Sequence, residues 1–343
     1  MRTCRLRPHG ETVAVQRRDK RAGYSGLVTC GSVWACPCCS AKIQSERTDE
    51  LTRALTVVAE RGWRVAMVTL TMRHRRGQAL AELWDALSPA WAAALTTDRR
   101  VQRAKRRAGV QGWVRRVEAT HGENGWHLHV HALVFFNGDP KALDELRSAA
   151  WAGWLRRLGR AGFDADERVE IDLRELSLEQ ARGELARYLN KVTYESAGRA
   201  ARELAGQLGK RGRRGTRTPF DVLADLTAIG EADDLAIWRE WEQASRGRRA
   251  ITWSDRGKLR KELLADEPER TDEEIAEATD GLGETVALLT RDPWGGLVVK
   301  AAEPGLLAAV ERAALDPYEA VAEYVAALGL PPPLRPPPAG DPP

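Results

Sequence analysis

The run Gly125-Trp-His-Leu-His-Val-His-Ala-Leu-Val-Phe-Phe136 decides the fold of this chain. Polar and apolar residues alternate along its first part, and such alternation is typical of a β-strand. On a strand, residues i, i+2 and i+4 share one face, so His127, His129 and His131 are predicted to project from the same side. The residues between them are apolar and face the other way. We therefore expect a strand that is buried on one side and carries imidazoles on the other.

Imidazoles gathered on a rigid strand indicate a site for a divalent metal, because histidine is a common metal ligand. Four of the six histidines of the chain lie between His121 and His131, which favours a metal site over a solvated polar face. His127 and His131 are separated by ~13 Å along an extended strand, too far for both to reach one ion easily. The metal pair is therefore His127 with His129 or His129 with His131. Glu118, expected on the strand across the turn, is the preferred third ligand, with His127 as the alternative.

Charge is unevenly distributed along the 343 residues, whose net charge is +4. Residues 262–343 contain 17 acidic and 5 basic side chains, a balance of −12, so residues 1–261 carry +16. A basic body of this kind suggests a polyanionic partner such as nucleic acid. Segments 99–116, 210–217 and 246–261 are candidates for holding backbone phosphates, although a solvated surface is the alternative for about half of them. The arginines expected to contact DNA are Arg103, Arg106, Arg107, Arg213, Arg214, Arg248 and Arg249.

Neither a secretory signal nor a membrane span is visible in the sequence. The first seven residues, Met1-Arg-Thr-Cys-Arg-Leu-Arg7, lack the apolar region of a signal peptide. No apolar run is long enough to cross a bilayer. We expect a soluble, cytoplasmic protein.

All five cysteines fall within the first 39 residues, at Cys4, Cys30, Cys36, Cys38 and Cys39. In a reducing compartment such clustering favours structural zinc over disulfides. Zinc in a structural site takes four ligands, and the spacing of Cys36 and Cys39 matches a zinc knuckle. The predicted ligands are therefore Cys4, Cys30, Cys36 and Cys39, with Cys38 as the surplus thiol. Ordinary buried thiols are the alternative.

Periodicity along residues 40–195 predicts one alternating series of helices and strands. Helices are expected at 40–63, 79–107, 140–160 and 178–195, and strands at 64–72, 112–120, 125–136 and 169–173. Asp139 is the expected N-cap before Pro140, and Ser177 and Gln180 resemble a capping box. The order β-α-β-β-α-β followed by a helix predicts an α+β fold of the split βαβ, ferredoxin-like kind. Its antiparallel sheet would have flanking helices and the histidine strand at its centre.

Five segments are expected along the whole chain. A Cys-rich zinc segment with a helix spans 1–62, the central α+β core 63–198, and a basic extension 199–261. Residues 220–244 are expected to be helical. Residues 246–254 are expected to be basic with a short strand at their centre. An acidic, mostly helical region spans 262–330, with a possible strand within 282–300. A proline-rich, disordered tail occupies 331–343.

The predicted helix 178–195 carries a second candidate group. Spacings of four and seven place Glu184, Tyr188 and Lys191 on one helical face. A tyrosine oxygen can act as a nucleophile, with a lysine stabilising negative charge and a carboxylate acting as general base. A surface ion pair beside a half-buried tyrosine is the alternative, and it is the commoner arrangement when such a triplet stands alone.

Taken together, these motifs resemble the HUH endonucleases, and among them the rolling-circle plasmid replication initiators of the actinobacterial (Streptomyces) type. Three motifs occur in the family's order: Val68-Thr-Leu-Thr71, Trp126 to Leu133, and the Glu184, Tyr188 and Lys191 triplet. Cys30-Gly-Ser-Val-Trp-Ala-Cys-Pro37 and Gly247-Arg-Arg-Ala-Ile-Thr-Trp-Ser254 also look like segments of these initiators. The resemblance covers roughly residues 4–260, and the ordered set is more specific than any single motif.

The resemblance implies His129 and His131 as the metal pair and Mg²⁺ or Mn²⁺ as the ion. It also implies DNA contacts from Thr69 and Thr71. Tyr188 would attack the scissile phosphate, giving a 5′-phosphotyrosyl bond and a free 3′-hydroxyl that primes replication. Glu184 would direct water at the second cleavage and release the protein. The implied partners are plasmid origin DNA, a host helicase and a DNA polymerase.

Three other functions remain open from the sequence. A conjugative relaxase or a transposase would use the same chemistry for another task. A non-catalytic, zinc-containing DNA-binding regulator would not need Tyr188 at all. A metal-dependent hydrolase of small substrates is disfavoured by the basic body.

Overall fold

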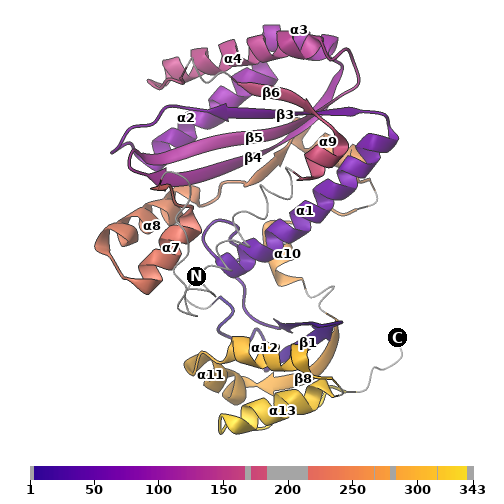
Figure 1. The fold of residues 1–343 in the computed structure, drawn as a ribbon, viewed down its shortest axis with the longest axis vertical. Coiled ribbons are helices and arrows are strands. Elements are labelled where there is room, and N and C mark those ends of the chain that lie inside the picture. The colour runs from indigo at the N-terminus through magenta and orange to yellow at the C-terminus, as the bar shows by residue number, and fades with distance from the viewer. Residues whose placement is uncertain are drawn as a thin grey trace. The chain divides into compact units, whose positions relative to one another are not determined.

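The computed structural model describes residues 4–166, 171–183, 215–265, 267–278, 283–314 and 316–337. Contacts divide the chain into two units (Figure 1). One unit spans residues 33–269, and the other joins residues 1–32 to residues 270–343. The chain is α+β, with antiparallel sheets flanked by helices.

The larger unit is built on a five-stranded antiparallel sheet in the order β6-β3-β5-β4-β7. The histidine strand β5 is its middle strand, as expected from its alternating pattern. A turn at residues 123–124 joins β4 to β5, which pair from Gly122 opposite Gly125 onward. The strands are β3 (Arg64–Thr71), β4 (Val110–Gly122), β5 (Gly125–Phe136), β6 (Asp172–Leu176) and β7 (Ile251–Trp253).

Helices follow the expected β-α-β-β-α-β order around this sheet. They are α1 (Pro37–Glu60), α2 (Leu80–Ala92), α3 (Arg99–Arg107), α4 (Ala142–Arg160), α7 (Pro219–Ala228), α8 (Ala232–Ser245) and α9 (Lys258–Leu263). A π-helical turn, η1 (Ala93–Thr97), lies between α2 and α3, and a short 3-10 turn, η3 (Ser254–Gly257), precedes α9. Among the described helices, none combines the length and the apolar character needed to cross a membrane.

Several expected boundaries were wrong, each for a local reason. The helix expected over 79–107 is interrupted because the Asp98 side chain accepts hydrogen bonds from the backbone N–H groups of Arg100 and Val101 and starts a new helix. Asp139 is not the N-cap of α4; the N-cap is Lys141, whose N–H donates to Asp139 Oδ1 at 2.9 Å.

Two further expectations were only partly correct. The strand placed at 169–173 is β6, which begins at Asp172 and pairs with β3, while residues 167–170 lie outside the described chain. The helical stretch 220–244 is two helices, α7 and α8, with Gly230 at φ 78° between them. A left-handed φ of this kind suits glycine and ends a helix.

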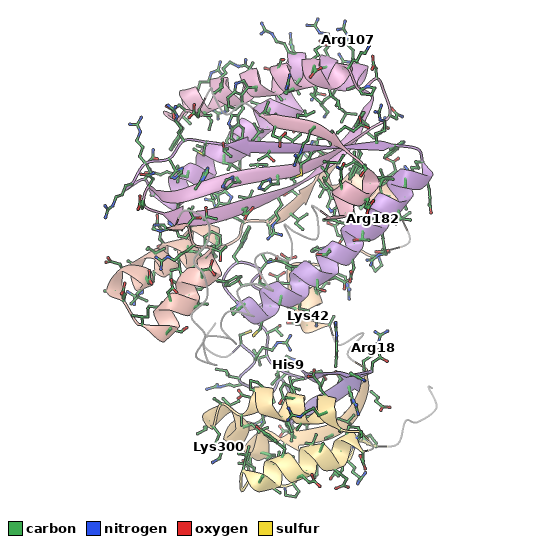
Figure 2. The ribbon with its side chains drawn as sticks, viewed as in Figure 1. His9, Arg18, Lys42, Arg107, Arg182 and Lys300 are labelled. Carbon is green, nitrogen blue, oxygen red and sulfur yellow. The ribbon has the colours of Figure 1, made fainter. Side chains whose placement is uncertain are left out.

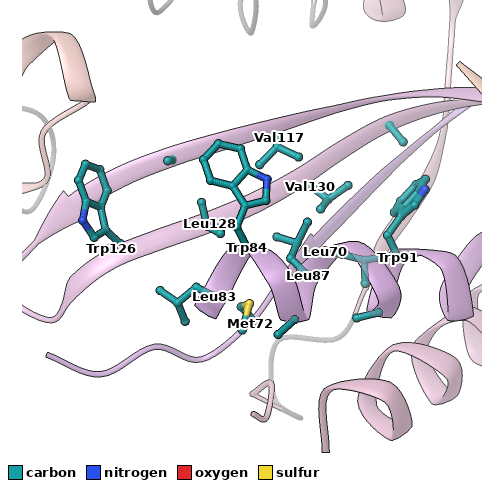
Figure 3. Packing of buried hydrophobic residues seen from close by; sticks show 14 of the residues in the cluster. Leu70, Met72, Leu83, Trp84, Leu87, Trp91, Val117, Trp126, Leu128 and Val130 are labelled. Atoms are coloured by element: carbon teal, nitrogen blue, oxygen red, sulfur yellow. The ribbon is translucent and has the colours of Figure 1, made fainter. Parts of the chain in front are cut away.

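The two faces of the sheet differ along their length. One face is apolar throughout: Val68, Leu70, Leu128 and Val130 pack against α2 and α4 around side chains such as Trp84 (Figure 3). On the opposite face, one end packs against α1 and α9 through Val65, Met67, Val114, Leu133 and Phe135. The remaining end of that face carries the polar residues described below.

The smaller unit contains a three-stranded antiparallel sheet in the order β2-β1-β8. Its strands are β1 (Thr12–Arg18), β2 (Arg21–Ser25) and β8 (Glu284–Thr290). Its helices are α10 (Asp272–Glu277), α11 (Arg291–Val299), α12 (Glu303–Arg312) and α13 (Pro317–Ala327). Val13 and Val15 of β1 are buried beside Leu289, Trp294 and Leu306. The N-terminal hairpin was not anticipated from the sequence, whereas a strand within 282–300 was.

Candidate functional site

The three histidines of β5 lie on one face of the sheet, as the alternation predicts. His131 is paired with Thr69 on β3 and with Arg116 on β4. His129 is paired with Thr71 and Glu118 in the same way. Directly paired residues on neighbouring strands point to the same side of a sheet. The result is a polar patch at the centre of the sheet, on the same face as the residues that pack against α1 and α9.

His131 and Glu118 form the best-defined part of this patch. His131 Nε2 lies 3.2 Å from Glu118 Oε2, and each side chain is 11% exposed. Two ligands bound at right angles, each about 2.1 Å from one ion, are about 3 Å apart. An imidazole nitrogen and a carboxylate oxygen at this spacing therefore fit two neighbouring positions around a small divalent cation.

Thr69 holds the other side of the His131 ring. Its Oγ1 lies 3.2 Å from His131 Nδ1. A hydrogen bond to the second ring nitrogen of a metal-binding histidine fixes the orientation of the ring and its tautomer. The expected DNA contact of Thr69 stays a prediction; in the folded protein its hydroxyl lies beside the imidazole of His131.

His127 has different neighbours. Its ring stacks on His74 at a centroid distance of 4.5 Å and lies 3.9 Å from the ring of His129. Burial, followed by the proximity of His129 and His74, lowers the pKa of His127 to about 3, so the ring is neutral near pH 7. Stacked rings direct their nitrogens within their own planes, so the His74–His127 stack does not by itself aim two nitrogens at one ion.

His74 was missed by sequence reasoning. It follows β3, three residues beyond Thr71, and burial lowers its pKa against the opposing effect of a hydrogen bond with the backbone of Met72. His74 is far from residues 127–131 in the sequence, so its contact with the ring of His127 could not be predicted from local pattern. The one available signal was its position just after a strand predicted to lie beside the histidine strand.

Arg116 is the second residue that sequence reasoning missed. Its Nη2 donates to Gln44 Oε1 at 3.2 Å, whereas its Nε and Nη1 are buried without a partner. Burial lowers the pKa of Arg116 to about 10, opposed by the charge of Glu118, so the guanidinium remains protonated at neutral pH. Arg116 and Glu118 line one narrow cavity together with Trp34, Phe220 and Trp241. A positive charge therefore lies buried beside the His131–Glu118 pair.

The sulfur atoms of Cys4, Cys30, Cys36 and Cys39 lie within 4.8 Å of one another and could hold a metal ion such as zinc. Four thiolates bound to one zinc at about 2.3 Å would lie about 3.8 Å apart, so a modest contraction of the group completes a tetrahedral site. Cys36 is the N-cap of α1 and is buried, as is Cys39. Cys38 is exposed and is not a member of the group.

The predicted nucleophile group lies outside the described residues: this applies to Glu184, Tyr188 and Lys191, and also to Arg213 and Arg214. The first turn of the helix predicted over 178–195 is described. Ser177 Oγ accepts from the N–H of Gln180 at 3.1 Å, and Gln180 Oε1 accepts from the N–H of Ser177 at 2.9 Å, which confirms the capping box.

That first helical turn packs on the histidine side of the sheet. Ala181 is fully buried among Leu55 of α1 and Val65 and Leu133 of the sheet. Arg182 donates to Thr56 Oγ1 of α1 at 3.1 Å. Val65 and Leu133 share their face with His131 because each lies an even number of residues along its strand from a member of the polar patch.

The arginines expected to contact DNA differ in their surroundings. Arg103, Arg106 and Arg249 are exposed. Arg107 pairs with Glu145 at 2.9 Å. Arg248 pairs with Asp85 at 2.8 Å and lies over the Trp84 ring at 5.1 Å, so its guanidinium is already engaged within the protein.

The chain belongs to the replication protein family, whose model matches residues 27–289. It is 30% identical over 358 aligned residues to "Protein rep" of Streptomyces lividans, covering 86% of this chain and 77% of that protein. These matches confirm the resemblance to plasmid replication proteins of the Streptomyces type and support a role in plasmid replication.

A second relative matches over a shorter stretch. The "Neomycin resistance protein" of Streptomyces cyanogenus is 31% identical over 137 residues, which is 33% of this chain and 31% of that protein. No significant match to a solved structure was found. The wider coverage of the replication protein makes it the better guide to this chain.

Proposed function

We propose that this protein initiates rolling-circle replication of a plasmid by nicking one strand of the origin with a tyrosine. The observation that carries the proposal is the His131–Glu118 pair on the central strands of a replication protein, with Thr69 orienting the imidazole. The strand order β6-β3-β5-β4 supports an HUH core, because it is the order of a ferredoxin-like split βαβ sheet.

The metal residues in this proposal are His129, His131 and Glu118, with His127 as the alternative third ligand. A bound Mg²⁺ or Mn²⁺ would supply Lewis-acid stabilisation of the scissile phosphate, and a mixed histidine and carboxylate site suits such an ion because it leaves positions open for phosphate oxygens. Thr69 keeps His131 in one orientation before DNA arrives. Arg116 adds buried positive charge beside Glu118, which favours an anionic substrate at this face.

Tyr188 is the proposed nucleophile. Its phenolic O–H loses its proton to solvent and the oxygen forms a bond to phosphorus. The bond from phosphorus to the 3′-oxygen breaks, and that oxygen takes a proton from solvent to become the 3′-hydroxyl primer. Lys191 stabilises the developing phenolate. The burial of Ala181 on the histidine side of the sheet supports this assignment, since the same helix is expected to continue to Tyr188.

Glu184 is proposed to act when replication ends. One helical turn before Tyr188, its carboxylate can take a proton from water that attacks the second scissile phosphate. Hydrolysis then replaces a second transfer to tyrosine and lets the protein leave its product. The four cysteines are proposed to bind structural zinc, and the host helicase and DNA polymerase are the proposed protein partners.

The decisive experiment incubates the protein with single-stranded origin DNA and Mn²⁺ and looks for a covalent protein–DNA adduct. Tyr188→Phe is expected to abolish the adduct while DNA binding persists, because only the nucleophilic oxygen is removed. Tyr194→Phe is the matched control: six residues further along a helix it lies about 240° away from Tyr188 and should retain the adduct.

Two outcomes would redirect the proposal. An adduct that survives Tyr188→Phe and disappears with Tyr194→Phe would identify the other tyrosine as nucleophile. An absence of any adduct, with intact DNA binding, would favour the non-catalytic regulator. A relaxase or transposase would form the adduct but would not support rolling-circle replication of a plasmid that depends on this protein.

A further inference from the structure

Helix α3 carries all its arginines on one side. At about 100° per residue, the five arginines fall within an arc of about 120°. These are Arg99, Arg100, Arg103, Arg106 and Arg107. The opposite side consists of Val101 and Ala104, followed by Ala108 just past the helix end, and all three are 0% exposed. The helix is therefore amphipathic, with a buried small-residue face and an arginine face in solvent.

Few acidic groups neutralise this arginine face. Arg107 pairs with Glu145 on α4. Arg99, Arg100, Arg103 and Arg106 are exposed and, within the described chain, have no acidic partner. Asp98, the nearest carboxylate in sequence, caps the helix and pairs with Arg156. About four positive charges thus stand together along a helix about 14 Å long.

The arginine face lies on the side of the sheet away from the histidines. Val101 and Ala104 pack against Ala66 and Phe136. These two residues point to the opposite face of the sheet from the histidines, because side chains alternate between faces along each strand. Arg107 is at the outer surface of α3, above the sheet (Figure 2). The thickness of a helix, roughly 10 Å, therefore separates the arginines from the sheet. A DNA strand seated at the histidines would therefore lie on the opposite side of the sheet from these arginines.

The side chains of the arginine face indicate which kind of partner it binds. A basic amphipathic helix that binds membranes or partner grooves inserts its apolar side, but the apolar side of α3 is already buried. Sites for single strands combine positive charge with aromatic side chains for base stacking, and α3 contains no aromatic residue. A row of arginines without stacking groups fits the phosphates of a duplex, which carries about one charge per 1.7 Å of axis.

We propose that α3 is a second DNA site, which binds double-stranded DNA through its phosphates. The strand to be cut would bind separately, at the histidine face. The presence of a cut strand at the histidine face rests on the proposed function; duplex binding by α3 does not depend on Tyr188. Such a site would hold the duplex next to the origin nick with little sequence preference, because phosphates carry no sequence information.

The test compares two double charge reversals in the full chain. Arg103→Glu with Arg106→Glu changes the arginine face. Arg239→Glu with Lys300→Glu makes the same change in charge at exposed positions elsewhere. Binding of a random-sequence 30-bp duplex is measured over a range of salt, together with cleavage of a short single-stranded nick-site oligonucleotide.

The α3 variant is expected to bind duplex at least 10-fold more weakly than the control variant. A plot of the logarithm of the association constant against the logarithm of the salt concentration has a negative slope. The magnitude of that slope should decrease by about 1.8, which is about 0.9 for each phosphate that is no longer neutralised. Oligonucleotide cleavage should stay within about 2-fold of wild type. The charge-preserving variant Arg103→Lys with Arg106→Lys should keep most of the affinity and the slope, since each lysine still neutralises a phosphate.

Unchanged duplex affinity and slope in the charge-reversed variant would overturn the proposal. An equal loss of duplex binding and oligonucleotide cleavage in a folded protein would also overturn it, because α3 would then belong to the nick site. Failure of the tyrosine mechanism has a separate signature: Tyr188→Phe would keep its adduct, while the α3 variant would still lose duplex binding.

Discussion

His131 has a polar neighbour at each of its two ring nitrogens. Glu118 lies at Nε2 and Thr69 at Nδ1, so the ring has one defined orientation before any ion binds. The neutral ring of His127 instead stacks on His74, and its centroid lies 3.9 Å from that of the tilted His129 ring. Both residues are histidines, but their neighbours differ: those on β3 and β4 make His131 a candidate metal ligand, whereas His127 packs against another imidazole.

We therefore expect His131→Ala and His129→Ala to lower Mn²⁺-dependent nicking by about 100-fold or more, since each removes a direct ligand. His127→Ala should cost less than about 10-fold. Mn²⁺ titration followed by calorimetry, in parallel with cleavage of the origin oligonucleotide, measures both effects. Equal losses from all three variants with unchanged folding would mean that His127 is also a ligand.

At the scale of elements, the break between α2 and α3 shows how one side chain sets the direction of a helix. The helical pattern continues from 79 to 107, yet the chain forms a π-helical turn and restarts at Asp98. Burial acts against ionisation of Asp98, but the backbone N–H groups of Arg100 and Val101 and then the charge of Arg156 lower its pKa below the ordinary value. Asp98 is thus a charged cap, and the arginine face of α3 begins at the next residue.

Asp98→Ala is expected to reduce the free energy of unfolding by about 1–2 kcal/mol, the usual effect of removing a helix cap. A carboxyl whose pKa is lowered on folding contributes stability above its unfolded pKa of about 4 and loses it as pH falls. The difference from wild type should therefore shrink as the pH falls below about 4. Urea unfolding at several pH values measures it.

Asp98→Asn is the matched control for this prediction. Its amide oxygen can still cap the helix, so it should cost less than alanine, and its effect should vary little with pH. A constant difference between wild type and Asp98→Ala from pH 7 to pH 2 would show that the carboxylate charge does not contribute.

At the scale of the whole molecule, the two ends of the chain fold together. Strand β1, near the N-terminus, pairs with β8, with Val13 opposite Leu289. The acidic character of residues 262–343 therefore does not mark an independent tail: part of this segment completes the sheet that β1 and β2 begin. The N-terminal residues also include Cys4 and Cys30, which join Cys36 and Cys39 in one group of sulfurs.

We expect the purified protein to contain about one zinc ion per chain, lost in Cys36→Ser, because a structural site closes with four thiolates. The variant should also unfold at a lower temperature than wild type. Metal analysis by mass spectrometry and thermal unfolding test this. Cys38→Ser should keep its zinc, since Cys38 lies outside the group. Zinc-free wild-type protein with undiminished stability would leave the four cysteines as ordinary thiols.

The sequence by itself determined the strand of three histidines, the faces of that strand and the order of elements around it. Alternation and helical periodicity record which side of each element is buried, and they can be recognised within a dozen residues. The Ser177–Gln180 capping box was predictable for the same reason, because both partners lie within one helical turn. The cysteine group was also predictable, since all five cysteines fall within the first 39 residues and share one chemistry.

Only the tertiary structure decided which side chains surround the histidines and where the ends of the chain belong. The neighbours of His74 and the buried guanidinium of Arg116 depend on strand register and on packing between elements. The pairing of β1 with β8 joins segments about 270 residues apart, and no local pattern encodes a partner at that distance. Hydrogen bonds in a sheet are satisfied by whichever strand is brought alongside, so this choice is made by the folded core as a whole.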